Sequence, residues 1–173
     1  MKKTFRLMAM VAVVSGMVLA SCGKDDKNNG TKDSYVDLAL HSGTKWKNAN
    51  EENAADAEYN FYTFEEAVAA FGNNLPTQEQ LEELKINCQW EWKGNGYRVT
   101  GGNGNSIFLP AASYRLCSGN GGTVEEVGSS GSYWSSTQYS ESSSAGYLIF
   151  SRYSVIVGDF AQCYGRSIRL VQD

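Results

Sequence analysis

Side chains that commonly carry out catalysis are few in this sequence. The chain has one histidine, His41, and its serines lie in Gly/Ser-rich stretches without a Gly-x-Ser-x-Gly elbow. The glycine-rich segment 101–105 precedes an expected strand rather than a helix, so it does not form a phosphate-binding loop. Paired-carboxylate catalysis would require Asp37, Glu91 or Asp159 to converge in space, and no pattern indicates that they do. The sequence therefore favours a protein that is not an enzyme.

Candidate ligand-binding residues lie mainly in one loop. The stretch 117–131 is rich in glycine and serine, and we interpret it as a long surface loop. It contains Asn120, Glu125 and Glu126, whose oxygens could contact a ligand but lack the dense alternating carboxylates of a calcium site. Tyr139 lies in polar sequence, and we expect it to be exposed as a further contact. We predict a ligand site at these four residues, with no metal and no cofactor.

The aromatic residues have two interpretations, since they could pack in the core or stack on sugar rings. We favour burial for Trp90 and Trp92, which alternate along one strand, and for Trp134. The candidates for a stacking platform are Trp90, Trp92, Tyr97, Tyr133, Trp134, Tyr139, Tyr147 and Tyr153.

Besides Cys22, the chain contains Cys88, Cys117 and Cys163, so at most one internal disulfide forms among these three. Spacing does not choose among the three pairings. The sequence has no Cys-x-x-Cys or Cys/His spacing, which argues against a zinc site.

Two short amphipathic helices are expected early in the domain. Residues 63–71 begin with Thr63 as N-cap and Glu66 three positions later, with Phe64, Ala67, Val68 and Phe71 on one face. A second helix begins at Thr77, where Gln80 completes another capping box and Leu81 and Leu84 face inward.

Short strands separated by turns make up most of the rest. Tyr35–Leu40 predicts a first strand and the polar residues 47–58 a loop. From Gln89 onward, glycine and asparagine separate short β segments, as antiparallel sheets require. The last three expected strands are 146–153, 154–160 and 167–171. The fold class is therefore α+β, with the helices first and the sheet after them.

The N-terminus has the pattern of a secretory signal. Lys2, Lys3 and Arg6 precede an uncharged apolar stretch, Leu7–Leu19, which is too short for a permanent transmembrane helix. The tetrad Leu19–Cys22 resembles the lipobox of bacterial lipoproteins, in which the cysteine becomes the lipid-bearing first residue. We therefore expect residues 1–21 to be removed and Cys22 to be lipidated, which implies a membrane as a partner.

Residues 22–34 lack apolar side chains after Cys22 and are expected to form a flexible tether of roughly 20 Å. Lys24–Asp26 also resembles the signal that sends some lipoproteins to the outer face of the outer membrane. Loss of three cationic residues with the signal changes the net charge from −4 to −7, which disfavours nucleic acid as a partner. Residues 35–173 are expected to form a single domain.

Five ordered blocks of the mature chain resemble the Fibrobacter succinogenes major paralogous domain, which is found among surface lipoproteins and fimbria-associated proteins. The blocks are Tyr35–Leu38 with Ser42–Trp46, Leu75–Thr77 with Glu82–Leu84, Asn103–Ala112 with Tyr114–Arg115, Gly131–Thr137, and Tyr164–Arg169. The resemblance implies a C-type-lectin-like fold, in which two helices pack on a small twisted antiparallel sheet with long loops.

The resemblance leads us to expect a surface lipoprotein that binds a glycan or a protein in adhesion or fimbria-associated assembly. Calcium-dependent sugar binding does not carry over, because the Glu-Pro-Asn and Gln-Pro-Asp signatures are absent. A structural subunit of the cell envelope without a soluble ligand is the alternative. An enzyme ranks third: residues 165–171 resemble the last strand of formylglycine-generating enzymes, but the motifs around the cysteine pair of those enzymes are missing.

Overall fold

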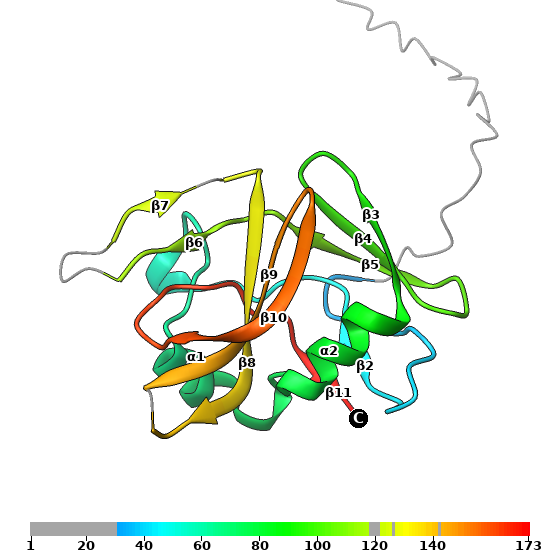
Figure 1. Cartoon of the computed structure of the whole chain (residues 1–173), viewed down its shortest axis with the longest axis horizontal. Helices are drawn as coiled ribbons and strands as arrows, with labels where there is room; N and C mark the ends of the chain where they lie inside the picture. Colours follow the sequence, from blue (N-terminus) through cyan, green and yellow to red (C-terminus); the bar gives the residue numbers. More distant parts are fainter. Residues whose placement is uncertain (1–30, 118–121, 126, 142) are drawn as a thin grey trace, which may run out of the picture.

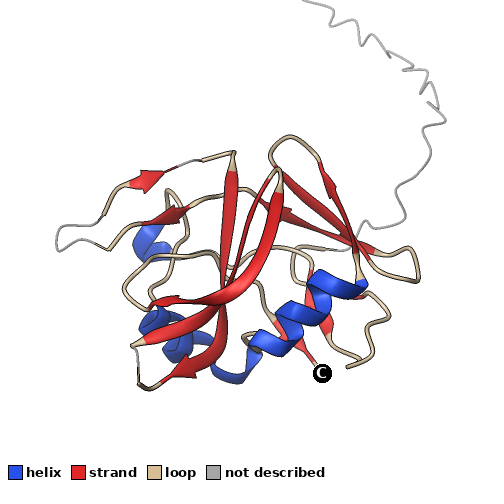
Figure 2. Cartoon of the chain, viewed as in Figure 1, coloured by secondary structure: helices blue, strands red, loops and turns tan. Residues whose placement is uncertain are grey.

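A computed structural model describes residues 31–117, 122–125, 127–141 and 143–173. These residues form an α+β domain with two α-helices and four small antiparallel sheets (Figures 1 and 2). The α+β prediction is therefore confirmed.

Both helices begin where their capping boxes predict. Helix α1 (Phe64–Phe71) follows Thr63, whose hydroxyl accepts a hydrogen bond from the backbone of Glu66. Helix α2 (Gln78–Asn87) follows Thr77, which makes the same contact with Gln80. Leu81 and Leu84 are buried as expected. The predicted inward face of α1 is wrong at Val68, which is 41% exposed because this short helix buries only Phe64 and Ala67.

A three-stranded sheet of β8 (Ser130–Tyr139), β9 (Ser144–Ser151) and β10 (Ser154–Ala161) occupies the centre of the domain (Figure 1). Strands β3 (Gln89–Trp92), β4 (Gly96–Thr100) and β5 (Ser106–Pro110) form a second sheet. The remaining sheets are β1 (Tyr35–Asp37), β2 (Lys45–Lys47) and β11 (Val171–Gln172), and the pair β6 (Tyr114–Arg115) and β7 (Val124–Glu125). Two 3₁₀-helices, η1 (Ala54–Asp56) and η2 (Gly72–Asn74), complete the described elements.

The central sheet separates two hydrophobic clusters, because successive side chains of a strand point to opposite faces. On one face, Tyr133, Leu148 and Phe150 pack with Leu81 and Leu84 of α2. On the other face, Trp134 and Ala145 pack with Phe64 and Ala67 of α1. The two helices therefore cover opposite faces of one sheet.

Several strand predictions differ from the structure. The stretch 117–131 is not only a loop, since β7 pairs with β6 and β8 begins at Ser130. The first strand ends at Asp37, before Ala39 with its positive φ of 54°. The last strand is reduced to β11, and residues 167–170 are buried without regular pairing. The expected loop 47–58 contains η1.

The structure shows which cysteines pair and how deeply three of the tryptophans are buried. Cys117 and Cys163 form a disulfide, whereas Cys88 is a free thiol at the end of α2. Trp134 is fully buried, as predicted. Trp90 and Trp92 are only half-buried, because they lie on an edge strand and pack against the rim of the core.

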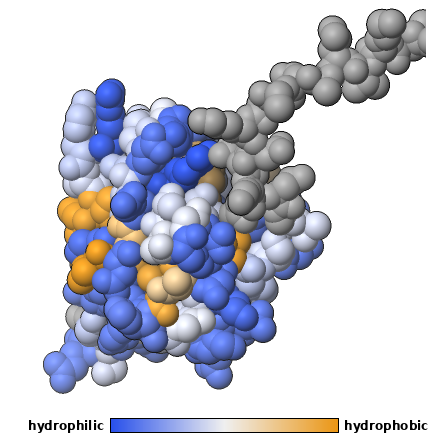
Figure 3. Space-filling view, turned by 90° about the vertical axis from the view of Figure 1, so that its right-hand side faces the viewer, coloured by the Kyte–Doolittle hydropathy of each residue, from blue (hydrophilic) through white to orange (hydrophobic). Residues whose placement is uncertain are grey.

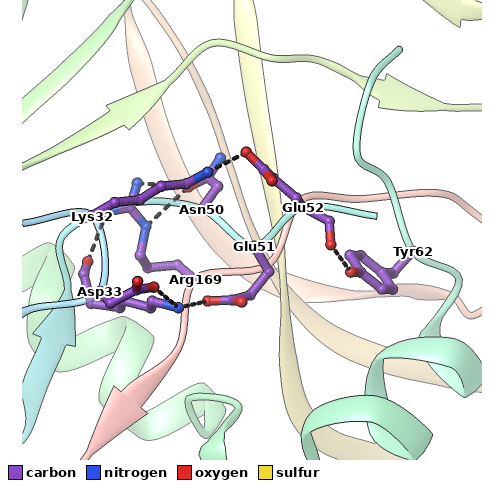
Figure 4. Close-up of polar contacts among 8 residues, drawn as sticks. Lys32, Asp33, Asn50, Glu51, Glu52, Tyr62 and Arg169 are labelled. Atoms are coloured by element: carbon purple, nitrogen blue, oxygen red, sulfur yellow. Dashed lines mark hydrogen bonds and ion pairs between the residues drawn. The ribbon is translucent and has the colours of Figure 1, made fainter. Parts of the chain in front are cut away.

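Polar contacts join the start of the described chain to the domain (Figure 4). Lys32 forms an ion pair with Glu52, and Asp33 lies 3.2 Å from the ammonium of Lys47. Lys47 also lies 2.6 Å from Glu51. Residues 32–34, which the sequence assigns to the tether, thus contact the folded domain.

The face on the right-hand side of Figure 1 is mostly hydrophilic, with small separate hydrophobic areas (Figure 3). No described helix is long and apolar enough to span a membrane.

Candidate functional site

A small pocket opens on the face of the central sheet that α1 also covers. Its volume is about 240 Å³. The walls come from β6, β9, β10 and the segment that follows β10. Most of the lining side chains are aromatic and one is cationic: Tyr114, Leu116, Tyr147, Ile149, Phe160, Tyr164 and Arg166.

Strand register determines which side chains reach this pocket. Leu148 and Phe150 point into the core. Tyr147 and Ile149 alternate with them along β9, so their side chains point to the opposite face and line the pocket. Phe160 lies on β10 opposite Ala145 of β9. Its ring centre is 6.0 Å from that of Tyr147 and 4.9 Å from that of Tyr164. The sheet thus supplies one wall made of contacting rings.

The part of the pocket formed by β6 and the segment after β10 is held by covalent and backbone bonds. The disulfide between Cys117 and Cys163 joins the end of the β6 segment to the loop after β10. Arg115 and Gly165 also exchange two backbone hydrogen bonds of 2.8 and 3.0 Å. Leu116 and Tyr164, which line the pocket, each adjoin a bonded cysteine.

Arg166 is the unusual member of the pocket. Only 2% of its surface is exposed, and its guanidinium carbon lies 4.2 Å from the ring centre of Tyr147 and 4.6 Å from that of Trp134. Its Nη1 donates a hydrogen bond to the hydroxyl of Ser132, while its buried Nε has no hydrogen-bond partner. The backbone of Arg166 is held by two hydrogen bonds of 2.9 Å with Tyr62.

The guanidinium of Arg166 is surrounded by aromatic rings. Within the described ranges, no carboxylate forms an ion pair with it. Burial lowers the pKa of its guanidinium to about 10, so the group stays cationic at neutral pH. Burying a charge costs several kcal/mol, and each cation–π contact returns only about 0.5–2 kcal/mol. An anion entering the pocket would give the guanidinium a charge-assisted hydrogen-bond partner.

The lining residues are suited to binding and not to proton transfer. They include no histidine, carboxylate, lysine or thiol that could act as a base or nucleophile near neutral pH. They do offer aromatic faces, phenol hydroxyls and one cation. This combination can hold a ring-shaped ligand that carries a negative charge.

A larger groove of about 660 Å³ lies beside β3, β4 and β5. It is lined by residues of both charge signs, and Lys93 and Glu91 in it form an ion pair of 2.5 Å. Lys93 and Glu91 therefore already compensate each other's charge at the surface of this groove.

Two of the four predicted ligand residues fall outside the part of the chain that the structure describes. Asn120, Glu126 and Cys22 lie outside the described residues. The backbone of Glu125 belongs to β7 and pairs with Tyr114 of β6. Tyr139 is 37% exposed, as expected, but lies at the end of β8 farther from β7, where its hydroxyl donates to Gln78 at 2.9 Å (Figure 1). Tyr139 therefore does not line the Arg166 pocket.

Arg166 was not predicted from the sequence as a site residue. Arg166 appeared only within the block Tyr164–Arg169, and Tyr147 only among the candidate aromatics. The available signal was a cation that follows two aromatic residues, Phe160 and Tyr164, in a stretch without acids.

Comparisons with protein-family models, curated protein sequences and solved structures find no match. The site must therefore be interpreted from its own geometry. Among the described residues, no group of three histidine, cysteine or acidic side chains is placed to hold a metal ion.

Proposed function

We propose that this chain is a non-catalytic lipoprotein of the bacterial outer membrane, displayed at the cell surface, whose domain binds a glycan or a protein. The proposed role is adhesion or fimbria-associated assembly. The observation that carries the binding function is the buried, cationic Arg166 in an aromatic pocket, where no carboxylate of the described residues pairs with it. A ligand anion would supply the partner that the described residues lack.

The proposed fold is C-type-lectin-like, in the Fibrobacter succinogenes major paralogous domain family. Support comes from the five sequence blocks, the two capped helices and the small antiparallel sheets. The last block includes Arg166, and the block Gly131–Thr137 includes Trp134, which contacts the guanidinium.

The position of the pocket agrees with display from a membrane anchor. The described chain begins near β2 and β5, on the right of Figure 1, whereas β6 and the loop after β10 lie on the left. A domain held through its N-terminus at Cys22 would then present the Arg166 pocket on a different side from its attachment.

Ligand binding is tested with the mature chain carrying Cys22→Ser, which removes the lipid and leaves the domain intact. Glycan arrays and pull-downs from surface extracts should return a ligand, and Arg166→Gln should abolish the signal. Arg152→Gln removes the same charge at an exposed position and should have no effect. A hydrolytic or oxidative activity without any ligand would overturn the proposal.

The anchor and its location need a separate experiment. The native chain should incorporate a labelled fatty acid, and Cys22→Ser should not. Protease added to whole cells should then degrade the anchored domain. Protection of the domain in intact cells, with degradation after lysis, would place it on an inner face instead.

A further inference from the structure

We infer that the Arg166 pocket takes a single acidic sugar residue of a glycan, namely a pyranose that carries a carboxylate. This inference rests on the proposed binding function and specifies its ligand class. The carboxylate would lie against the guanidinium of Arg166, and the sugar ring would pack on Tyr147, Phe160 and Tyr164.

The size of the pocket limits the ligand to a small unit. Pockets for drug-sized ligands hold roughly 300–1,000 Å³. The Arg166 pocket, at about 240 Å³, is below this range and suits one monosaccharide ring. The rest of a glycan would extend into solvent.

The guanidinium of Arg166 favours a ligand that carries a carboxylate over a neutral ligand. Nη1 is already bonded to Ser132, and the buried Nε has no hydrogen-bond partner among the described residues, so the guanidinium keeps donor capacity for a ligand. A carboxylate is the preferred partner of a guanidinium, and such charge-assisted hydrogen bonds are about twice as strong as neutral ones. The attraction is strengthened because the charge is shielded from water.

The phenol groups of Tyr147 and Tyr164 favour a sugar over a peptide C-terminus as the ligand. In the described part of the chain, the hydroxyls of Tyr147 and Tyr164 make no hydrogen bond. They can therefore exchange hydrogen bonds with sugar hydroxyls while their rings pack on the apolar C–H face of the pyranose. The end of a peptide chain would leave these hydroxyls without partners.

The first experiment compares four probes on the mature Cys22→Ser chain by NMR titration: methyl glucuronide, methyl glucoside, acetate and N-acetyl-leucine. Methyl glucuronide should bind roughly tenfold or more tightly than methyl glucoside, which has the same ring without the carboxylate. It should also bind more tightly than acetate, which lacks the ring. Chemical-shift changes should centre on residues 114–116, 147–149 and 160–166.

The second experiment uses variants that separate the contacts. Arg166→Gln should remove the difference between glucuronide and glucoside, while Arg152→Gln should preserve it. The double variant Tyr147→Phe and Tyr164→Phe keeps both rings, and should weaken glucuronide binding several-fold without weakening acetate binding. Tyr153→Phe, at a tyrosine that is 88% exposed, is the matched control. If the Arg166→Gln variant does not fold, the double variant Tyr147→Phe and Tyr164→Phe serves as the test of the sugar contacts.

The outcomes distinguish the ligand class from the binding function. If N-acetyl-leucine binds in the pocket more tightly than glucuronide, the ligand is a peptide carboxylate, and the sugar inference is wrong while the binding function stands. Equal affinity for glucuronide and glucoside also overturns the acidic-sugar inference. If no probe shifts the pocket residues and glycan arrays and pull-downs give no ligand, both proposals fail.

Discussion

Two buried arginines on the same C-terminal segment illustrate two uses of a guanidinium. Arg169 donates hydrogen bonds of 2.6 and 2.9 Å to the side chain of Asn50 (Figure 4). It also donates to the carbonyl oxygens of Lys47 and Phe108, at 2.8 and 2.7 Å. Arg166 has one side-chain hydrogen bond and is otherwise surrounded by rings. Arg169 thus joins segments of the fold, whereas Arg166 retains capacity for a ligand.

The role of Arg169 predicts the effect of changing its partner. Asn50→Ala removes the acceptor of two N–H groups and leaves them buried, so we expect a loss of about 1.5–3 kcal/mol in the free energy of unfolding. Urea denaturation measures this loss. Asn73→Ala, at an exposed position, should change stability by less than about 0.5 kcal/mol. Equal effects of the two substitutions would contradict the structural role of Asn50.

Cys88 should be an unreactive thiol. Burial, with a smaller contribution from Glu83, raises its pKa from 9.0 to about 11. At pH 8 the thiolate fraction should therefore be about 100-fold lower than for an ordinary thiol, and alkylation by iodoacetamide should slow accordingly. The Cys22→Ser chain has Cys88 as its one free thiol while the disulfide is intact, so the rate reports this site.

The same pKa shift has a consequence for stability. The folded state favours the protonated thiol, so the contribution of Cys88 to the free energy of unfolding is full below pH 9. It is lost as the pH rises toward about 11.

Denaturation in guanidinium chloride should restore the ordinary alkylation rate of the Cys88 thiol. Rapid alkylation of the folded chain at pH 8 would show that Cys88 is accessible and normally ionised.

At the scale of elements, local signals predicted the helices better than the sheets. Each helix starts with a Thr-x-x-Glu or Thr-x-x-Gln box, and the contacts that make the cap span only three residues. Strand β7 was missed because its partner β6 is separated from it by a glycine-rich stretch, so composition alone indicated a loop.

The capping interaction gives a direct test at this scale. Thr77→Ala should destabilise the domain by about 1 kcal/mol, because the backbone N–H of Gln80 loses its acceptor at 3.2 Å. Thermal unfolding followed by circular dichroism measures the change. Thr77→Ser keeps the hydroxyl and should stay within a few tenths of a kcal/mol of the native chain. If the serine variant is as unstable as the alanine variant, packing of the threonine methyl group is responsible instead.

At the scale of the whole molecule, the pocket exists only because distant segments meet. Tyr114, Tyr147, Phe160 and Arg166 come from separate elements, and strand register together with the disulfide brings them to one place. No local pattern encodes this meeting, which is why the sequence indicated aromatic candidates but not the site. The sequence also left the disulfide pairing open, since the proximity of Cys117 and Cys163 depends on the same long-range packing.

The disulfide should therefore affect binding as well as stability. It closes a loop with a sequence separation of 46, for which the chain-entropy estimate is about 4 kcal/mol. The double variant Cys117→Ala and Cys163→Ala should lose stability of this order in urea denaturation. It should also bind glucuronide more weakly under conditions in which it is fully folded, because Leu116 and Tyr164 adjoin the two cysteines and would gain freedom.

Cys88→Ser controls for loss of a thiol and should leave binding unchanged. Unchanged affinity in the folded double variant would mean that the backbone bonds between Arg115 and Gly165 suffice to hold the pocket wall.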